Sequence, residues 1–196
     1  MAPYCHQMRT FEAAMRMELE GCAFYREHAE GVEQPELKRI LLELAEDELR
    51  HFAVFEALRD GRAVEYDEST KTQIVRTLKC VYTELRASGV AFHFEDDAAA
   101  IWAQARDLER QAETYYRQQA FLAAKPNERE ALNKIADEEY RHRVVLEQVL
   151  EFLEDPAGYL DSSEWSQLSD TLRPLAPTAE VREGDARCGD DGESAA

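Results

Sequence analysis

The chain has 196 residues and a formal net charge of −18 at pH 7. Its length fits one ordinary domain with some chain to spare. The negative charge repels nucleic-acid phosphates and argues against a DNA or RNA binder. No stretch approaches the roughly 20 apolar residues of a membrane span, and the N-terminus lacks the basic-then-apolar pattern of a secretion signal. We therefore expect a cytoplasmic protein without nucleic-acid or membrane partners.

The first third of the chain predicts two long helices. Apolar residues recur at helical spacing over Thr10–Glu30 and Glu36–Arg59. Gly31 ends the first helix, and Pro35 suits the first turn of the second, where its missing N–H costs nothing. Together these segments form a helical hairpin.

A long connection over residues 62–95 leads to the second half of the chain. Within it, Ser69 is placed to cap a shorter helix that runs to about Ala87. Two further long helices are expected, at about 98–124 and 127–153, and Asp155-Pro156 breaks the last of them. No clear further helix follows.

The chain is expected to divide into a helical domain, residues 1–160, and a mostly disordered C-terminal extension, residues 161–196. From about Ser169 onward the sequence is rich in Pro, Gly, Asp, Glu and Ala, which is typical of disorder. Trp165 and Leu168 precede that stretch and can still dock on the helices. The scattered cysteines contain no CxxC pair, so we expect free thiols and no thiolate metal centre.

The second half of the chain repeats the first at an offset of 91 residues. The motif Glu, then Tyr seven residues on, then Glu-x-x-His occurs twice, with no insertion between its parts. The sequence therefore describes two helical hairpins of one design joined by a crossover. The matched positions are Glu18 with Glu109, Tyr25 with Tyr116, Pro35 with Pro126, Glu48 with Glu139 and His51 with His142.

The spacing of this motif predicts a metal site. Residues at i and i+3 share one face of a helix, so each Glu-x-x-His pair projects together. Both pairs lie on apolar stripes, where an ionised carboxylate is costly unless it is paired or metal-bound. Two divalent cations would supply the charge that four inward carboxylates require, as in di-iron and di-manganese bundles. The predicted ligands are Glu18, Glu48, His51, Glu109, Glu139 and His142.

One copy of Glu-x-x-His would be weak support, because surface Glu and His pairs are common in so acidic a chain. Two copies, each 30 residues after a matched glutamate, favour the metal site. Glu46, Asp47 and Glu138 flank the predicted ligands, either as solvated residues or as guides that draw cations inward.

These motifs resemble the rubrerythrin-like di-iron domains of the ferritin-like superfamily. Glu18–Tyr25 and Leu44–His51 are similar to the family's first hairpin, and Glu109–Tyr116 and Ala136–His142 to its second. The resemblance covers about residues 8–155. It implies an all-α, ferritin-like four-helix bundle made of two helical hairpins joined by a long crossover that contains a short helix.

The resemblance also implies a role for each site residue. The glutamates that would bridge both metals are Glu48 and Glu139. The glutamates that would each bind one metal are Glu18 and Glu109. Each histidine, His51 and His142, would give one nitrogen to one metal. Tyr25 and Tyr116 are the candidate catalytic residues, whose hydroxyls would hold carboxylates in place. Aromatic core residues with satisfied hydroxyls fit the same pattern equally well.

The sequence departs from the peroxide-reducing rubrerythrins in two respects. Ala112 stands where they carry an additional glutamate, and Glu113 beside it is rotated off the ligand face. The chain also lacks a rubredoxin-like cysteine centre to supply electrons. Both departures weaken a specific peroxidase assignment and leave the metal site intact.

The resemblance implies two iron ions as the cofactor, although manganese or zinc fits the same ligands. We expect an oxidoreductase that reacts with peroxide or O2, in peroxide reduction or Fe(II) oxidation, for oxidative-stress defence or iron handling. An unidentified electron donor would be its partner. The alternative is a non-catalytic iron-binding or storage protein. A homodimer is expected, with Phe52 and Val144 as candidates for its interface.

Overall fold

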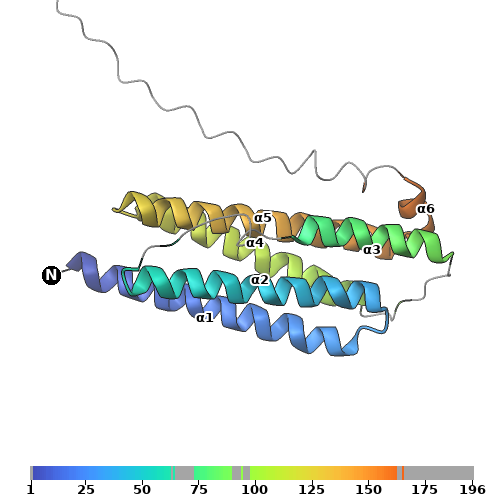
Figure 1. Ribbon diagram of the computed structural model, residues 1–196, viewed down its shortest axis with the longest axis horizontal. Helices are drawn as coiled ribbons and strands as arrows, with labels where there is room; N and C mark the ends of the chain where they lie inside the picture. Colours follow the sequence, from blue (N-terminus) through green and yellow to red (C-terminus); the bar gives the residue numbers. More distant parts are fainter. Residues whose placement is uncertain are drawn as a thin grey trace, which may run out of the picture.

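The computed structural model describes residues 2–62, 64, 73–89, 94, 98–162 and 165, with side chains from residue 9 onward. This part of the chain is helical and contains no strand (Figure 1). The prediction of an all-α, ferritin-like bundle is confirmed. The helices are α1 (Ala2–Gly31), α2 (Pro35–Arg59), α3 (Ile74–Ser88), α4 (Ala98–Leu122), α5 (Pro126–Glu154) and α6 (Pro156–Asp161).

The four long helices form two antiparallel hairpins, α1 with α2 and α4 with α5 (Figure 1). Pro35 and Pro126 open the second helix of each hairpin, as the sequence predicts. The residues before them, Gln34 and Lys125, have extended backbones because a proline disfavours helical geometry in the residue that precedes it. Both turns are therefore short, and each hairpin packs closely.

The short crossover helix α3 packs against α2 and α5 at one end of the bundle (Figure 1). Its buried apolar residues include Leu78 and Val81. Gly89 follows α3 with φ of +61°, a left-handed conformation that glycine adopts without strain. The helix begins at Ile74, and the predicted cap Ser69 lies outside the described residues.

The helix boundaries differ from the predicted ones at both ends of the bundle. α1 begins at Ala2 instead of Thr10, because nothing in between breaks a helix and Pro3 suits a first turn. α5 ends at Glu154, just before the expected break at Asp155-Pro156, but a further short helix, α6, starts at once. The Asp155 side chain accepts a hydrogen bond from the Gly158 N–H at 3.1 Å, which caps this helix.

The described part of the C-terminal segment docks on the bundle. Trp165 is buried and packs edge-on against Tyr82, with ring centroids 6.0 Å apart. This contact with α3 confirms that Trp165 docks. Leu168 and the segment from Ser169 onward lie outside the described residues.

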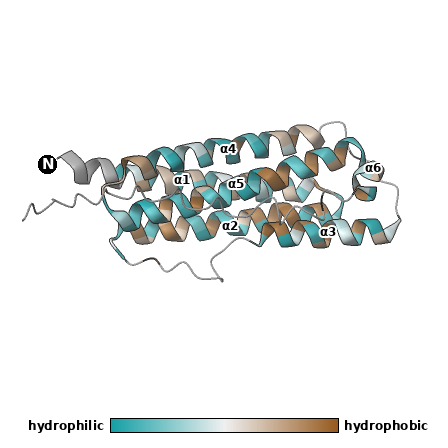
Figure 2. Ribbon diagram, turned by 90° about the horizontal axis from the view of Figure 1, so that it is seen from above, coloured by the Kyte–Doolittle hydropathy of each residue, from teal (hydrophilic) through white to brown (hydrophobic). Residues whose placement is uncertain are grey.

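Buried apolar residues form two clusters, and each long helix contributes to both. The cluster near α3 contains Leu41, Tyr82 and Phe152, and hydrophobic residues of α2 and α3 lie next to one another there (Figure 2). The opposite cluster contains Phe55 and Leu132. Between the two clusters α1 and α4 each carry one buried glutamate, and α2 and α5 each carry three buried acidic or histidine residues. The apolar core is therefore divided by a polar layer at mid-bundle.

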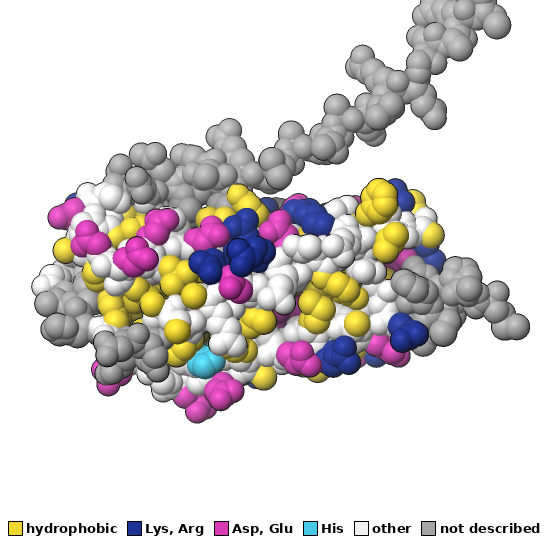
Figure 3. Space-filling view, turned by 180° about the vertical axis from the view of Figure 1, so that it is seen from behind, with side chains coloured by type: hydrophobic (Ala, Val, Ile, Leu, Met, Phe, Trp, Pro, Cys, Tyr) yellow, Lys and Arg dark blue, Asp and Glu magenta, His cyan; other side chains and the backbone are white. Residues whose placement is uncertain are grey.

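In the described ranges, no helix combines the length and hydropathy that crossing a membrane requires. Acidic, basic and apolar side chains are interspersed on the face shown in Figure 3.

Replacing Phe152 by alanine should lower the free energy of unfolding by about 3–5 kcal/mol, because it leaves a cavity in the core. Phe152 is fully buried against Tyr82 and Tyr159. Urea denaturation measures the loss. Phe121 is 86% exposed, so Phe121→Ala is the matched control and should change stability by less than about 0.5 kcal/mol. Equal effects of the two substitutions would contradict the described packing.

Candidate metal centre

The six predicted ligands meet in the polar layer between the two apolar clusters. Each hairpin supplies one glutamate from its first helix and a Glu-x-x-His pair from its second. All six side chains are buried, with at most 5% of any residue exposed. They are Glu18 of α1, Glu48 and His51 of α2, Glu109 of α4, and Glu139 and His142 of α5.

The ligand atoms form two overlapping groups that share Glu48 and Glu139. One group adds Glu18 and His51, and the other adds Glu109 and His142. Within each group the ligand atoms lie within 4.8 Å of one another. Two neighbouring cations that share two carboxylates require an overlap of this kind.

Glu139 lies between the two histidines. Its Oε1 is 3.0 Å from His51 Nδ1, and its Oε2 is 3.1 Å from His142 Nδ1. Glu18 Oε2 lies 3.6 Å from His51 Nδ1, and Glu109 Oε1 lies 3.6 Å from His142 Nδ1. Both Nδ1 atoms therefore face carboxylate oxygens at the centre of the site.

The other ring nitrogen of each histidine contacts a carboxylate from the opposite hairpin. His51 Nε2 is 3.0 Å from Glu138 Oε2, and His142 Nε2 is 3.0 Å from Asp47 Oδ2. A carboxylate at this position favours an N–H on Nε2, which leaves the Nδ1 lone pair for a metal. Arg50 forms an ion pair with Asp47 in turn.

Asp47 and Glu138 were not recognised as part of the site from the sequence. Both are buried, so they are neither solvated nor positioned as external guides for cations. Glu46, in contrast, is exposed and forms an ion pair with Arg26 at 2.9 Å. The repeat contained the missing signal, because an acidic residue directly precedes the glutamate of both Glu-x-x-His pairs.

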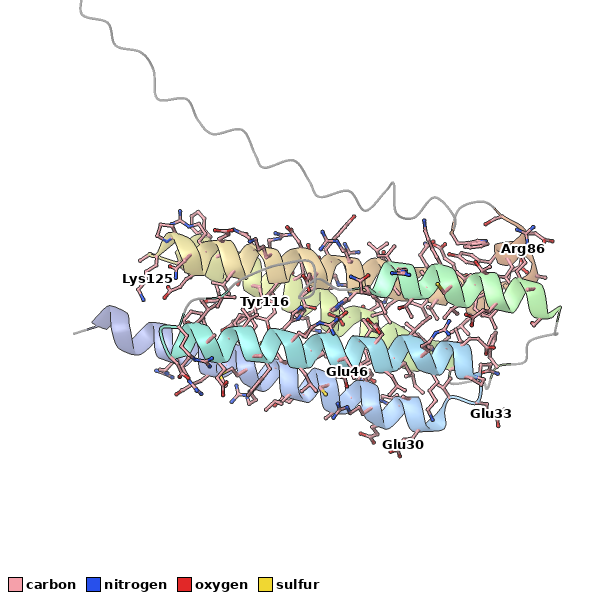
Figure 4. The ribbon with its side chains drawn as sticks, in the orientation of Figure 1. Glu30, Glu33, Glu46, Arg86, Tyr116 and Lys125 are labelled. Atoms are coloured by element: carbon pink, nitrogen blue, oxygen red, sulfur yellow. The ribbon has the colours of Figure 1, made fainter. Side chains whose placement is uncertain are left out.

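The two candidate tyrosines connect the hairpins. The Tyr25 hydroxyl donates a hydrogen bond to Glu109 Oε1, and the Tyr116 hydroxyl donates to Glu18 Oε1. Tyr116, labelled in Figure 4, extends from α4 toward the facing hairpin. Burial raises the pKa of both tyrosines well above the ordinary value, and the nearby carboxylates raise it further. Both hydroxyls therefore keep the protons that they donate.

The pKa values of Glu48 and His142 reflect the short distances between the buried carboxylates. Burial raises the pKa of Glu48 well above its ordinary value, and the charges of Glu18, Glu139 and Glu109 add to this effect. Burial would lower the pKa of His142, but Glu109 and Glu139 outweigh it and raise the value to about 9. Without metal, the site therefore retains protons that a cation would displace.

Two buried polar atoms indicate that these residues fit a cation. His51 Nδ1 and Glu139 Oε1 form an ion pair at 3.0 Å, but neither atom has a well-aligned hydrogen bond among the described residues. Leaving buried polar atoms unsatisfied costs roughly 1–3 kcal/mol each. A cation bound by both atoms removes that cost. Imidazole and carboxylate together accept iron, manganese or zinc.

The structure thus brings together all eight predicted site residues, the six ligands and both tyrosines. The arrangement is compatible with binding a metal. The chemical role of each residue stays a prediction.

Residues 10–91 match the family model Rubrerythrin. No curated protein and no solved structure matches the chain. The matched segment includes α2, α3 and most of α1, so it contains Glu18, Glu48 and His51. The match covers less than half of the chain and is to a family of the ferritin-like superfamily, and no rubredoxin domain is indicated. The ligands of α4 and α5 lie outside the match and rest on the internal repeat and on the geometry.

Asp47→Asn and Glu138→Gln should each lower the affinity for a divalent metal by about 10–100-fold, because each removes the charge that orients a histidine. Competition titration with Zn²⁺ and a chromophoric chelator measures the affinity. Glu46→Gln, in the same turn of α2 but exposed, is the control and should bind as the unaltered protein does. An unchanged affinity in Asp47→Asn would show that the carboxylate does not support the site.

Proposed function

We propose that this protein binds two iron ions between its hairpins and acts as an oxidoreductase toward peroxide or O2. The reaction would be peroxide reduction or Fe(II) oxidation. The observation that carries the proposal is the pair of overlapping ligand groups with two shared glutamates. The rubrerythrin-family match over the first hairpin supports iron as the metal.

In this proposal the six ligands balance the charge of the two cations. Four carboxylates and two neutral imidazoles compensate two divalent cations without excess charge. Glu48 and Glu139 would be shared, while Glu18 and Glu109 would each belong to one position. A bound iron pair would supply the two electrons that reduce peroxide or O2.

The surrounding side chains would hold this ligand set in place. Tyr25 and Tyr116 each orient a terminal glutamate through a hydrogen bond. Asp47 and Glu138 orient the two histidines. Since every one of these contacts crosses from one hairpin to the other, docking of the hairpins would fix the geometry before any substrate arrives.

Peroxide reduction and Fe(II) oxidation are equally supported as the reaction. Ala112 is half-buried and offers no fifth carboxylate, so no residue on α4 distinguishes a peroxidase.

A homodimer stays part of the proposal, although the predicted interface residues Phe52 and Val144 are half-buried. Phe121 and Leu122, at the end of α4, are the most exposed large apolar residues of the described chain.

Protein from iron-supplemented cells should contain close to two irons per chain. Adding hydrogen peroxide to the reduced form should produce the near-ultraviolet absorption of an oxidised iron pair. Glu48→Ala and Glu139→Ala should each lose most of the iron and this absorption, because each removes a shared ligand. Metal analysis and absorption spectroscopy measure both quantities.

The exposed Glu46 provides the control, since Glu46→Ala should retain both irons and the absorption change. Iron content that is equally low in the unaltered protein and in all three variants would refute the metal centre. Repeated turnover of peroxide with an added electron donor would support an enzyme. Uptake well beyond two irons per chain would favour the storage alternative.

A further inference from the structure

A cavity of about 230 Å³ lies at the end of the bundle where α1 turns into α2. Both hairpins line it, through the α1–α2 turn, the start of α4 and the end of α5. Its lining includes the exposed Glu27 and Glu33 as well as the buried Leu37 and Trp102. Glu33, labelled in Figure 4, lies in the turn itself. The cavity therefore extends from the surface toward the core.

The size and the lining of this cavity fit a single aromatic ring. A protein cavity of about 150 Å³ is large enough to bind benzene, whereas drug-sized ligands occupy roughly 300–1,000 Å³. Phe94, Ile101 and Trp102 offer apolar and aromatic contact, and His28 and Gln34 offer hydrogen-bonding groups. One ring that carries hydroxyl groups matches this combination.

The charge of the lining disfavours anionic ligands. The described residues around the cavity include Glu27 and Glu33 but no lysine or arginine, and the whole chain carries a net charge of −18. These carboxylates repel a phosphate or carboxylate group on a ligand, but they accept hydrogen bonds from hydroxyl groups. The cavity therefore suits a ring that is hydroxylated and uncharged.

Aromatic side chains connect the cavity to the predicted metal ligands. The His28 ring, which lines the cavity, lies 4.3 Å from the Phe24 ring, and that ring lies 5.6 Å from Tyr25. Tyr25 in turn donates its hydrogen bond to Glu109. Trp102 also lines the cavity, and it precedes Glu109 by two turns, or about 10 Å, on the same face of α4. Only a few side chains therefore separate a ring in the cavity from the metal centre.

We propose that this cavity binds a small hydroquinone, which supplies electrons to the metal pair. The hydroquinone is oxidised to a quinone and releases two electrons and two protons. One electron reduces each of two ferric ions to the ferrous state, and the protons leave through the exposed end of the cavity. This inference rests on the proposed function and names the chemical class of its electron donor.

The first test measures binding alone, in the full chain loaded with Zn²⁺, which is not reduced. Unsubstituted hydroquinone should shift the NMR signal of the Trp102 indole N–H, with a dissociation constant on the order of 0.1–1 mM for so small a ligand. The chain has two tryptophans, so the signal of Trp165, which does not line the cavity, is the internal control and should stay unchanged. Trp102→Phe identifies the two signals.

Charge and space are then varied separately. Dihydroxybenzenesulfonate, the same ring with a negative charge, should bind about tenfold more weakly or worse. Ala98→Phe places a second ring in the cavity and should weaken hydroquinone binding by about tenfold or more. Ala99→Phe, exposed and outside the lining, is the matched control and should change it by less than about twofold. Circular dichroism and zinc content check that both variants fold.

The second test measures electron supply in the iron-loaded protein. The rate at which hydroquinone removes the near-ultraviolet absorption should reach a maximum as its concentration rises. The half-maximal concentration should equal the dissociation constant of the zinc form. Ala98→Phe should slow the reduction by about tenfold at low hydroquinone concentration, and Ala99→Phe should leave it unchanged.

Several results would overturn the inference while leaving the metal centre intact. One is a Trp102 signal that does not move, or that moves no more than the Trp165 signal, which the unaltered protein decides without any variant. Another is equal binding by Ala98→Phe and Ala99→Phe. Tighter binding of phenyltrimethylammonium, which donates no electrons, would assign the cavity to organic cations instead.

The two proposals also fail in distinguishable ways. A reduction rate that rises without a maximum, in a protein that holds two irons, would refute the electron-donor role alone. Failure to hold two irons would refute the proposed function and the electron-donor role together. In that case the titration of Trp102 would still report whether the cavity binds the ring.

Discussion

The burial of six carboxylates, four of them candidate ligands, in one layer of an apolar bundle is the constraint on which the rest of the structure depends. Ionised groups in such surroundings are unfavourable unless opposite charge or hydrogen bonds compensate them. Here the histidines, the two tyrosine hydroxyls and retained protons provide partial compensation. His51 Nδ1 and Glu139 Oε1 form an ion pair without a well-aligned hydrogen bond, so a bound cation would add to this compensation. The stability of the bundle and its affinity for metal are therefore linked.

The contacts that support the ligands run between the hairpins and not within them. Tyr25 of the first hairpin binds Glu109 of the second, and Tyr116 binds Glu18 in return. The carboxylates behind the histidines follow the same crossed pattern. Neither hairpin alone contains a complete ligand group with its supporting contacts. The apolar clusters on either side of the layer bring the hairpins together and thus assemble the site.

Much of this arrangement could be predicted from the sequence, because the repeat made a weak motif specific. Helical spacing places each glutamate and histidine on an inward face, so the six candidate ligands followed from this spacing together with the repeat. The role of Asp47 could not be derived in that way, because its partner His142 lies on another helix and sequence spacing reports only neighbours on one helix. The start of α1 and the presence of α6 were missed for a different reason. Both depend on local capping and on the lack of a helix breaker, which apolar periodicity does not report.

The crossover that joins the hairpins has a consequence for how the two halves can change. A site assembled from two separate copies of one hairpin is necessarily symmetric, since every substitution appears on both sides at once. Once a single chain carries both hairpins, each half can vary independently. Position 21 is glycine where position 112 is alanine, and position 47 is aspartate where position 138 is glutamate. Covalent linkage thus allows two positions with almost the same ligands to acquire different surroundings.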